Sequence, residues 1–274
     1  MQAIRHYLLA VQFFTRIPIT GRLAHWVGFS PAMLRASSAH FPGVGWIVAV
    51  WAVLVYAALH AALGSNPFAP AVAAVGCTIA TVLLTGGFHE DGLADVTDGL
   101  GGSYDRERAL DIMKDSRIGA FGAMALVLAL LAKCSLLALL GAHSLGAALA
   151  ALVGGHVLSR WWPLWLVRCL PHVGDTAKSK SKPLADQISN FSLAAAGLWC
   201  VAPLALVWQL QSVLLVALAA LCSAVAAAHM ARRLARRLQG FTGDGLGAVQ
   251  QLGEVGFYLG AALALGPLAQ GVSA

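Results

Sequence analysis

The sequence predicts an all-α fold, a polytopic integral membrane bundle of six to seven transmembrane helices. Of its 274 residues, 59% are hydrophobic and only 11% are charged, and the mean hydropathy is +0.75. So few charges could not cover the surface of a soluble globule of this size, whereas the composition is typical of polytopic membrane proteins. We therefore expect one membrane-embedded domain, residues 1–274.

Seven apolar stretches are long enough to cross the hydrocarbon core as helices. In chain order they cover 42–63, 70–88, 118–140, 146–170, 192–210, 212–230 and 248–269. The pair on either side of Gln211 could instead form one bent re-entrant hairpin, which would reduce the count. Residues 1–20 carry Arg5 and Arg16 around a short apolar run. We interpret them as an amphipathic helix at the membrane interface rather than a span or a cleavable signal.

The distribution of lysine and arginine predicts the orientation. Basic residues gather in the connections 88–117, 171–190 and 231–247, whereas the short connections between them carry none. The positive-inside rule then places these three connections and the N-terminus in the cytoplasm. We read the net charge of +6 as a signal of orientation rather than of a nucleic-acid partner.

Acidic residues concentrate in the segment 86–122, which holds eight of the twelve in the chain. Within a helix Asp91, Asp95 and Asp98 would share one face, and Asp111 and Asp115 repeat the i, i+4 spacing. Like charges at these spacings repel and destabilise a helix. The pattern therefore predicts that a positive charge lies nearby to compensate them. Neighbouring Arg and Lys residues could supply it, or a divalent metal. Carboxylates with one nearby histidine and no cysteine favour Mg²⁺ or Mn²⁺ over Zn²⁺.

Glycines in the same segment favour a binding site over a merely solvated, salt-bridged loop. Six of them stand among the acids, at 86, 87, 92, 99, 101 and 102. They leave the backbone bare, as the close approach of a phosphate would require.

Three further features are candidates for function. Arg160 lies inside an apolar stretch, where a charge is costly; it is either functional or reaches back to the interface. Asp244 stands in a glycine-flanked turn before the last stretch and could belong to the site or be only part of a helix cap. The lysines of connection 171–190 could hold a phosphate or only set orientation: Lys178, Lys180 and Lys182.

Several classes of protein are not indicated. The five cysteines are scattered singly, which argues against zinc, a redox motif or disulfides. Apart from His89 the histidines show no ligand spacing, and no Ser/His/Asp or Cys/His arrangement is visible. A GxxxxGK[ST] phosphate loop is absent, so an ATPase motor is not expected.

Six segments in order resemble the cobalamin synthase family, the adenosylcobinamide-GDP ribazoletransferases. They are FFTRIPI (13–19), FPGVGW (41–46), GGFHEDGLADVTDGLGG (86–102), IMKDSRIGAFG (112–122), SRWWP (159–163) and GFTGDGLGAVQQLGE (240–254). The resemblance implies a bacterial inner-membrane enzyme with its active site on the cytoplasmic side. It would transfer the adenosylcobinamide-phosphate moiety of adenosylcobinamide-GDP to α-ribazole or its 5′-phosphate, with release of GMP. Mg²⁺ would be the cofactor, with Mn²⁺ as a possible substitute. The implied partners are these substrates and the lipid bilayer, with no nucleic acid and a possible homo-oligomer.

Attack of a hydroxyl on a diphosphate needs neutralised phosphoryl oxygens and a group that accepts the proton. We therefore expect metal ligands and a base among the acids: Asp91, Asp95 and Asp98 as ligands, and Asp115 as a further ligand or the base. His89 is the alternative base. Substrate and phosphate binding is assigned to Lys114, Arg117, Arg160 and Asp244, the last reaching the site if the last helix lies alongside the acidic segment.

Two alternatives stay open. The carboxylate order of Asp95, Asp98, Asp111 and Asp115 partly resembles the CDP-alcohol phosphotransferases, but the Ala-Arg and second glycine of that pattern are missing. A divalent-cation or corrinoid transporter would also gather carboxylates, yet it should place acids at mid-membrane on several spans, and only Glu254 approaches that depth.

Overall fold

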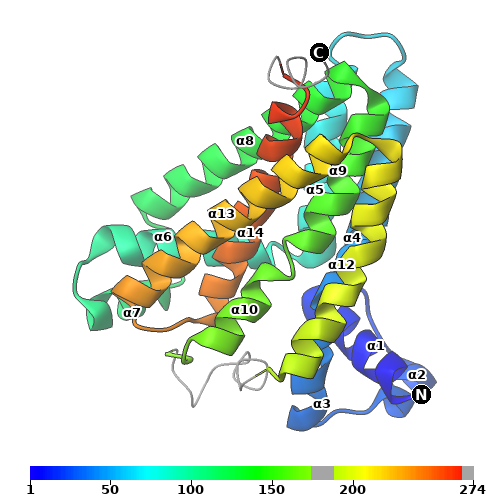
Figure 1. Ribbon diagram of the computed structural model, residues 1–274. Coiled ribbons are helices and arrows are strands. Elements are labelled where there is room, and N and C mark those ends of the chain that lie inside the picture. Colours follow the sequence, from blue (N-terminus) through cyan, green and yellow to red (C-terminus); the bar gives the residue numbers. More distant parts are fainter. Residues whose placement is uncertain (174–187, 267–274) are drawn as a thin grey trace.

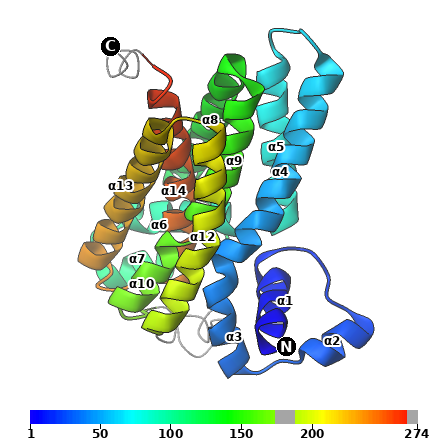
Figure 2. The ribbon, with the colours of Figure 1, turned by 45° about the vertical axis from the view of Figure 1, so that its right-hand side comes forward.

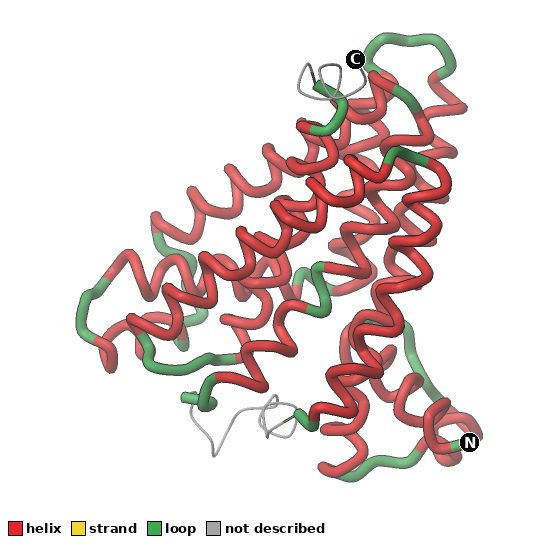
Figure 3. The backbone as a smooth tube through the Cα atoms, in the orientation of Figure 1, coloured by secondary structure: helices red, strands yellow, loops and turns green. Residues whose placement is uncertain are grey.

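The computed structural model describes residues 1–173 and 188–266. Within these ranges the chain consists of helices and short connections, apart from one isolated β-bridge between His172 and Phe241 (Figure 3). The all-α prediction is therefore confirmed for the described residues. The lysines at 178, 180 and 182 lie outside them.

The helices of the described residues are α1 (Gln2–Phe14), α2 (Gly21–Val27), α3 (Pro31–Ser37), α4 (Phe41–Leu63), α5 (Ala69–Thr85), α6 (Phe88–Gly102), α7 (Arg106–Met113), α8 (Ala120–His143), α9 (Leu145–Leu158), α10 (Trp162–Cys169), α12 (Asn190–Leu210), α13 (Val213–Arg237) and α14 (Gly243–Leu263), with a 3₁₀ turn over Ser38–His40. Helices α4, α5, α8 and α12 match predicted apolar stretches to within three residues, whereas α13 ends seven residues beyond 230 and α14 begins five residues before 248.

Four helical segments are long and apolar enough to cross a membrane: Pro31–Leu63, α8, α12 and α13. Helices α5 and α6 qualify only together, as one span broken by an 89° bend, so the structure shows four to five candidate spans. Because α12 and α13 each qualify alone, the region around Gln211 holds two full helices rather than one re-entrant hairpin. The predicted stretch 146–170 divides into the shorter α9 and α10, and α14 carries polar side chains. The count of six to seven therefore stays a prediction.

The bend between α5 and α6 depends on two consecutive glycines. Gly86 and Gly87 have φ of +75° and +70°, a conformation that L side chains rarely adopt. A Cβ at Gly86 would also lie 2.2 Å from Nε of Arg16, whose backbone N–H donates to the Leu84 carbonyl at 2.7 Å. These two glycines of the acidic segment thus serve to turn the chain.

Beyond the bend, α6 runs across the ends of three other helices instead of continuing through the bundle (Figure 1). Along its length it meets the first turn of α14 at Gly92, the start of α8 at Asp98 and the end of α13 at Leu100. The guanidinium of Arg237 links α13 to the end of α6, because it donates to the carbonyls of Leu100 and Ser103. The acidic segment and the arginine-rich end of α13 therefore meet at one end of the bundle.

The N-terminal helices form a separate group beside this end. Figure 2 shows α1, α2 and α3 together next to the start of α4. In contrast, α9 and α14 lie in the interior, and most of their residues are buried.

Candidate active site

Carboxylates from two distant parts of the chain meet where α6 crosses the start of α14. Asp91, Asp95 and Asp98 come from α6, and Asp244 stands in the first turn of α14. The helices approach closely because residue 92 is glycine: a Cβ there would lie 2.7 Å from the backbone oxygen of Asp244. We refer to Asp91, Asp95, Asp98 and Asp244 as the carboxylate cluster.

Electrostatics show that these four charges are near one another. Burial, together with the charges of Asp244, Asp91 and Asp98, raises the pKa of Asp95 to about 7. Burial and the charge of Asp91 raise the pKa of Asp244 to about 6. Carboxyls that resist ionisation for these reasons are frequent at functional sites, where a cation or a proton relieves the repulsion.

Asp98 has an additional structural task. Its Oδ2 accepts the N–H of Gly119 at 2.7 Å and its Oδ1 accepts the N–H of Gly122 at 2.8 Å, at the start of α8. The carboxylate thus satisfies two amides of the first turn of α8 and fastens α6 to it. Both partners must be glycine, because a Cβ at either would lie within 2.4 Å of an Asp98 oxygen.

The other acidic candidate and its basic neighbours lie on the surface, in the connection after α7. Asp115 accepts from Nη2 of Arg117 at 2.6 Å and from its Nε at 3.0 Å, and these bonds lower the pKa of Asp115 to about 2. Nζ of Lys114 lies 3.8 Å from Oδ1 of Asp111. The structure does not bring these residues into the carboxylate cluster. Exposed pairs of this kind are weak, so Lys114 and Arg117 can exchange them for a phosphate.

His89 and Arg160 lie deeper in the bundle. The ring of His89 stacks on Phe41 at 5.7 Å, and its Nε2 is buried without a hydrogen-bond partner. Arg160 is only 2% exposed; its Nη1 donates to the His156 carbonyl at 2.6 Å and its guanidinium lies over the Phe41 ring. Neither side chain belongs to the carboxylate cluster.

A second cluster of polar side chains lies in the interior of the bundle, near His89. Glu254 of α14 pairs with Lys133 of α8 at 2.5 Å and contacts Nδ1 of His156 of α9 at 3.3 Å. The hydroxyl of Tyr258 donates to the same carboxylate at 3.0 Å, and Nε2 of Gln250 donates at 2.7 Å. We call Lys133, His156, Arg160 and Glu254 the buried ionic cluster.

The two clusters are joined by a glutamine. Nε2 of Gln251 donates to Oε1 of Glu90 at 3.0 Å, and Glu90 directly precedes Asp91 on α6. The same nitrogen donates to Oε1 of Gln250, which in turn bonds Glu254. The ionic cluster therefore fixes α14 against the helix that carries the acids. Sequence reasoning gave His156 no role and overlooked Lys133, although a lysine within an apolar stretch is itself a signal.

The donor set suits a magnesium ion that also binds a substrate. Among the described residues no three His, Cys, Asp or Glu side chains converge closely enough to enclose a metal ion by themselves. Magnesium rarely uses an all-protein cage, since it commonly takes one or two carboxylates together with waters and substrate phosphates. Asp95 and Asp244, whose pKa values are raised, with Asp91 beside them, would supply that number of carboxylates.

We expect Gly92→Ala to impair the site more than the fold. The added methyl would meet backbone atoms of Asp244 at 2.7 to 2.9 Å, which cannot rotate away, so it should push α14 off α6. We expect turnover to fall at least about tenfold and stability to fall by about 1–3 kcal/mol. Thermal unfolding in detergent and activity assays check this.

Gly146→Ala is the matched control, because its Cβ would meet only Nε2 of Gln211 at 3.6 Å. Equal losses in both variants would contradict the role given to Gly92.

Comparison with known proteins agrees with the motifs at this site. The family model of cobalamin-5-phosphate synthase matches residues 6–262. A protein of Polaromonas sp. strain JS666 named adenosylcobinamide-GDP ribazoletransferase is 59% identical, over 96% of this chain and 98% of its own length. Proteins of the same name are 60% identical in Albidiferax ferrireducens, over 96% and 99% of the two chains, and 40% identical in Vibrio cholerae, over 92% and 91%. No solved structure matches the chain significantly. The chain therefore belongs to the cobalamin-5-phosphate synthase family.

Proposed function

We propose that the protein transfers the adenosylcobinamide-phosphate moiety of adenosylcobinamide-GDP to α-ribazole or its 5′-phosphate. A ribose hydroxyl of the acceptor forms the new bond to the phosphorus that carries cobinamide, and the bond from that phosphorus to GMP breaks. The products are GMP and adenosylcobalamin or its 5′-phosphate. The observation that carries the proposal is the carboxylate cluster, assembled from the two longest segments that resemble the family. Relatives that share its length bear the name of this activity.

Within this proposal each polar residue has a task. Asp95 and Asp244, with Asp91 beside them, would hold Mg²⁺ together with substrate phosphates, and Mn²⁺ can substitute for it; Asp98 fastens α6 to α8. When bound, the metal supplies positive charge that neutralises diphosphate oxygens. Lys114 and Arg117 reach the phosphates from the neighbouring surface connection. Asp115 would accept the hydroxyl proton once Arg117 has turned from it to a phosphate, with His89 as the alternative base.

The reaction is assigned to the cytoplasmic face of a bacterial inner membrane. The arginine-rich end of α13 and the basic connection around α7 lie at the same end of the bundle as the carboxylate cluster. Connections rich in Lys and Arg are retained in the cytoplasm. The nucleotide substrate would then be bound on the side where nucleotides are made.

Release of GMP tests the proposal. Purified protein in lipid vesicles should release GMP from adenosylcobinamide-GDP plus α-ribazole when Mg²⁺ is present and stop when EDTA is added. Turnover of a CDP-activated lipid without any release of GMP would favour the alcohol phosphotransferase alternative. Transport of Mn²⁺ across the vesicle wall without chemistry would favour the transporter.

The binding of Mn²⁺ should depend strongly on pH. A metal ligand must be ionised, and with pKa values of about 7 for Asp95 and about 6 for Asp244, both are mostly protonated at pH 5.5. We expect the Kd for Mn²⁺ to rise about 100-fold between pH 8 and pH 5.5. Calorimetry on the wild type and on Asp95→Asn checks this, since the variant should lose most of the dependence.

The stability of the metal-free protein should change with pH in the opposite sense. Because both pKa values are raised on folding, these groups stabilise the fold most at low pH, and that contribution is lost as pH rises from about 4 to 7.

A Kd for Mn²⁺ that does not vary with pH would contradict the assignment of Asp95 and Asp244 as ligands.

A further inference from the structure

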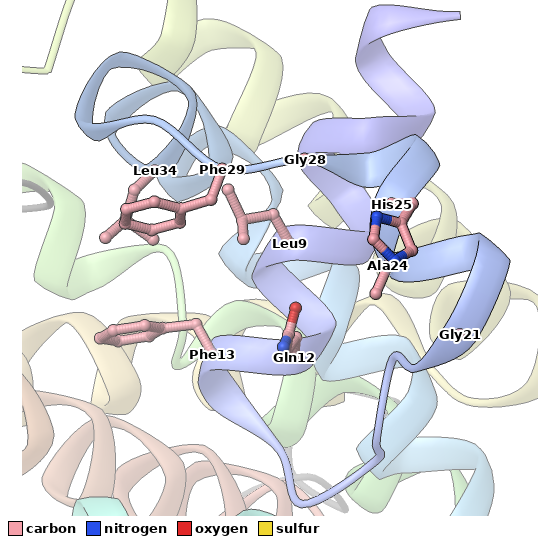
Figure 4. Close-up of a pocket in the computed structure, with 9 residues that line it drawn as sticks. All are labelled: Leu9, Gln12, Phe13, Gly21, Ala24, His25, Gly28, Phe29 and Leu34. Atoms are coloured by element: carbon pink, nitrogen blue, oxygen red, sulfur yellow. The ribbon is translucent and has the colours of Figure 1, made fainter.

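A groove of about 650 Å³ lies between the first three helices. It is lined by Leu9, Gln12, Phe13, Gly21, Ala24, His25, Gly28, Phe29 and Leu34. In Figure 4 the rings of Phe13, from α1, and Phe29, from the connection between α2 and α3, point to one side of α1, whereas His25 lies on α2 at the other side; Gln12 stands next to Phe13 on α1. The wall combines aromatic and aliphatic side chains with about as much polar surface, which would match a small ligand that has both a flat apolar part and polar groups.

The walls of the groove are held in place without a ligand. Nε of Arg5 donates to the Val27 carbonyl at 2.9 Å, which fastens the end of α2 to α1. Oγ of Ser30 accepts the N–H of Met33 at 3.1 Å and caps α3. Leu9 and Leu34, which also line the groove, are otherwise buried. Binding would therefore cost little ordering of the protein.

The groove adjoins the carboxylate cluster. Phe13 meets the ring of Phe88 edge to face at 6.2 Å, and Phe88 begins α6, one turn before Asp91. A smaller cavity of about 30 Å³ also touches Phe13 and is lined by Gly243 and Gly247, on either side of Asp244. A ligand in the groove thus lies beside the elements that carry the acids.

The chemistry of the lining discriminates between the substrates. Guanine presents N–H donors that need acceptors such as carboxylates, yet none of the described residues that line the groove is acidic. The benzimidazole base of ribazole has an accepting ring nitrogen and no N–H donor, which suits the amide of Gln12, next to Phe13 on α1. Its flat fused rings suit stacking on phenylalanine. The corrin, with its many side arms, is far larger than either base.

We propose that the groove binds the acceptor nucleoside, with its benzimidazole base against Phe13 and Phe29 and its ribose directed towards α6. This inference rests on the proposed function, since it names the place of one substrate of that reaction. Phe29 is the best probe because it is 68% exposed, so that its truncation should not disturb the core.

Steady-state kinetics of Phe29→Ala test the groove. We expect the KM for α-ribazole to rise about tenfold, as loss of a stacking ring should cause, while the KM for adenosylcobinamide-GDP stays within about twofold. Gln12→Leu should raise the KM for α-ribazole in the same selective way. Phe68→Ala, at a phenylalanine that is 72% exposed near the start of α5, is the matched control and should leave both constants unchanged.

Equilibrium dialysis of α-ribazole against metal-free protein separates failure of the groove from failure of the function. If the wild type releases no GMP, the proposed function fails, whereas weaker dialysis binding by Phe29→Ala than by the wild type would still support the groove. Unchanged binding and an unchanged KM for α-ribazole overturn the groove, whatever the turnover. Weaker binding of phosphatidylglycerol by detergent-solubilised Phe29→Ala than by the wild type, with an unchanged KM for α-ribazole, would assign the groove to lipid instead.

Discussion

Asp95→Asn should lose turnover by at least about 100-fold while the protein remains folded. Changing a residue that only supports a metal ligand typically lowers metal affinity or activity about 10- to 100-fold. Removing a ligand itself should therefore lower turnover by at least about 100-fold. Of the four acids in the carboxylate cluster, Asp95 is the one on which the charges of the other three act. The asparagine keeps the shape of the side chain but removes the charge that would bind Mg²⁺.

The fold should tolerate this change, because it relieves repulsion. The carboxyl of Asp95 is half-buried beside Asp91 and Asp244, so a neutral amide removes a desolvated charge from among like charges. We therefore expect the metal-free variant to unfold at the same temperature as the wild type or above it. GMP release, Mn²⁺ titration and thermal unfolding in detergent are the three measurements.

Asp111→Asn is the matched control for Asp95→Asn. Asp111 is exposed on α7, and its partner within 4 Å is Lys114 at 3.8 Å. Turnover in this control should stay within about twofold of the wild type. Turnover near that of the wild type in Asp95→Asn would remove Asp95 from the site, and a large loss in Asp111→Asn would enlarge the site towards α7.

The helices could be predicted from sequence because the period and length of apolar stretches are local properties. The stretch 42–63 corresponds to α4 and 192–210 to α12, with bounds within two residues. Gly86 and Gly87, both in the left-handed conformation, turn the chain between α5 and α6. From the sequence alone we had expected them to leave the backbone open to a phosphate. The three helical acids of α6 were likewise found from their spacing.

Contacts between distant segments could not be predicted in this way. Asp98 was expected as a ligand, yet its oxygens bond the amides of Gly119 and Gly122, which only the crossing of α6 and α8 brings near. The approach of Asp244 to Asp95 depends on the space that Gly92 leaves. The pairing of Lys133 with Glu254 joins two helices far apart in the chain. Each of these relations follows from packing, which no local pattern encodes.

Glu254→Gln should destabilise the protein strongly, by about 3–5 kcal/mol. The carboxylate of Glu254 has a side-chain exposure of 1% and pairs with Lys133, whose side-chain exposure is 3%. Removing its charge leaves the ammonium of Lys133 buried without the carboxylate that compensates it, and the buried Arg160 loses the same nearby negative charge. Thermal and denaturant unfolding in detergent measure the loss.

The double variant Lys133→Met/Glu254→Gln should recover much of that stability, because it removes both partners. A buried ion pair replaced as a whole is often neutral, since the desolvation cost of both charges disappears with their attraction. The coupling between the two changes should therefore reach about 2 kcal/mol or more. Glu107→Gln is the control: its side-chain exposure is 74% in a surface pair with Arg106, and it should change stability by less than about 0.5 kcal/mol.

The same variants separate a structural role of the buried ionic cluster from a positioning role. Gln251 and Gln250 connect Glu254 to Glu90, next to Asp91, so a cluster that positions the acids should affect activity even where stability has recovered. We expect the double variant to fold well but to show a raised KM for Mg²⁺. Full recovery of both stability and metal affinity would show that the cluster only holds α8, α9 and α14 together. An additive loss, with no recovery in the double variant, would mean that Lys133 and Glu254 do not depend on one another.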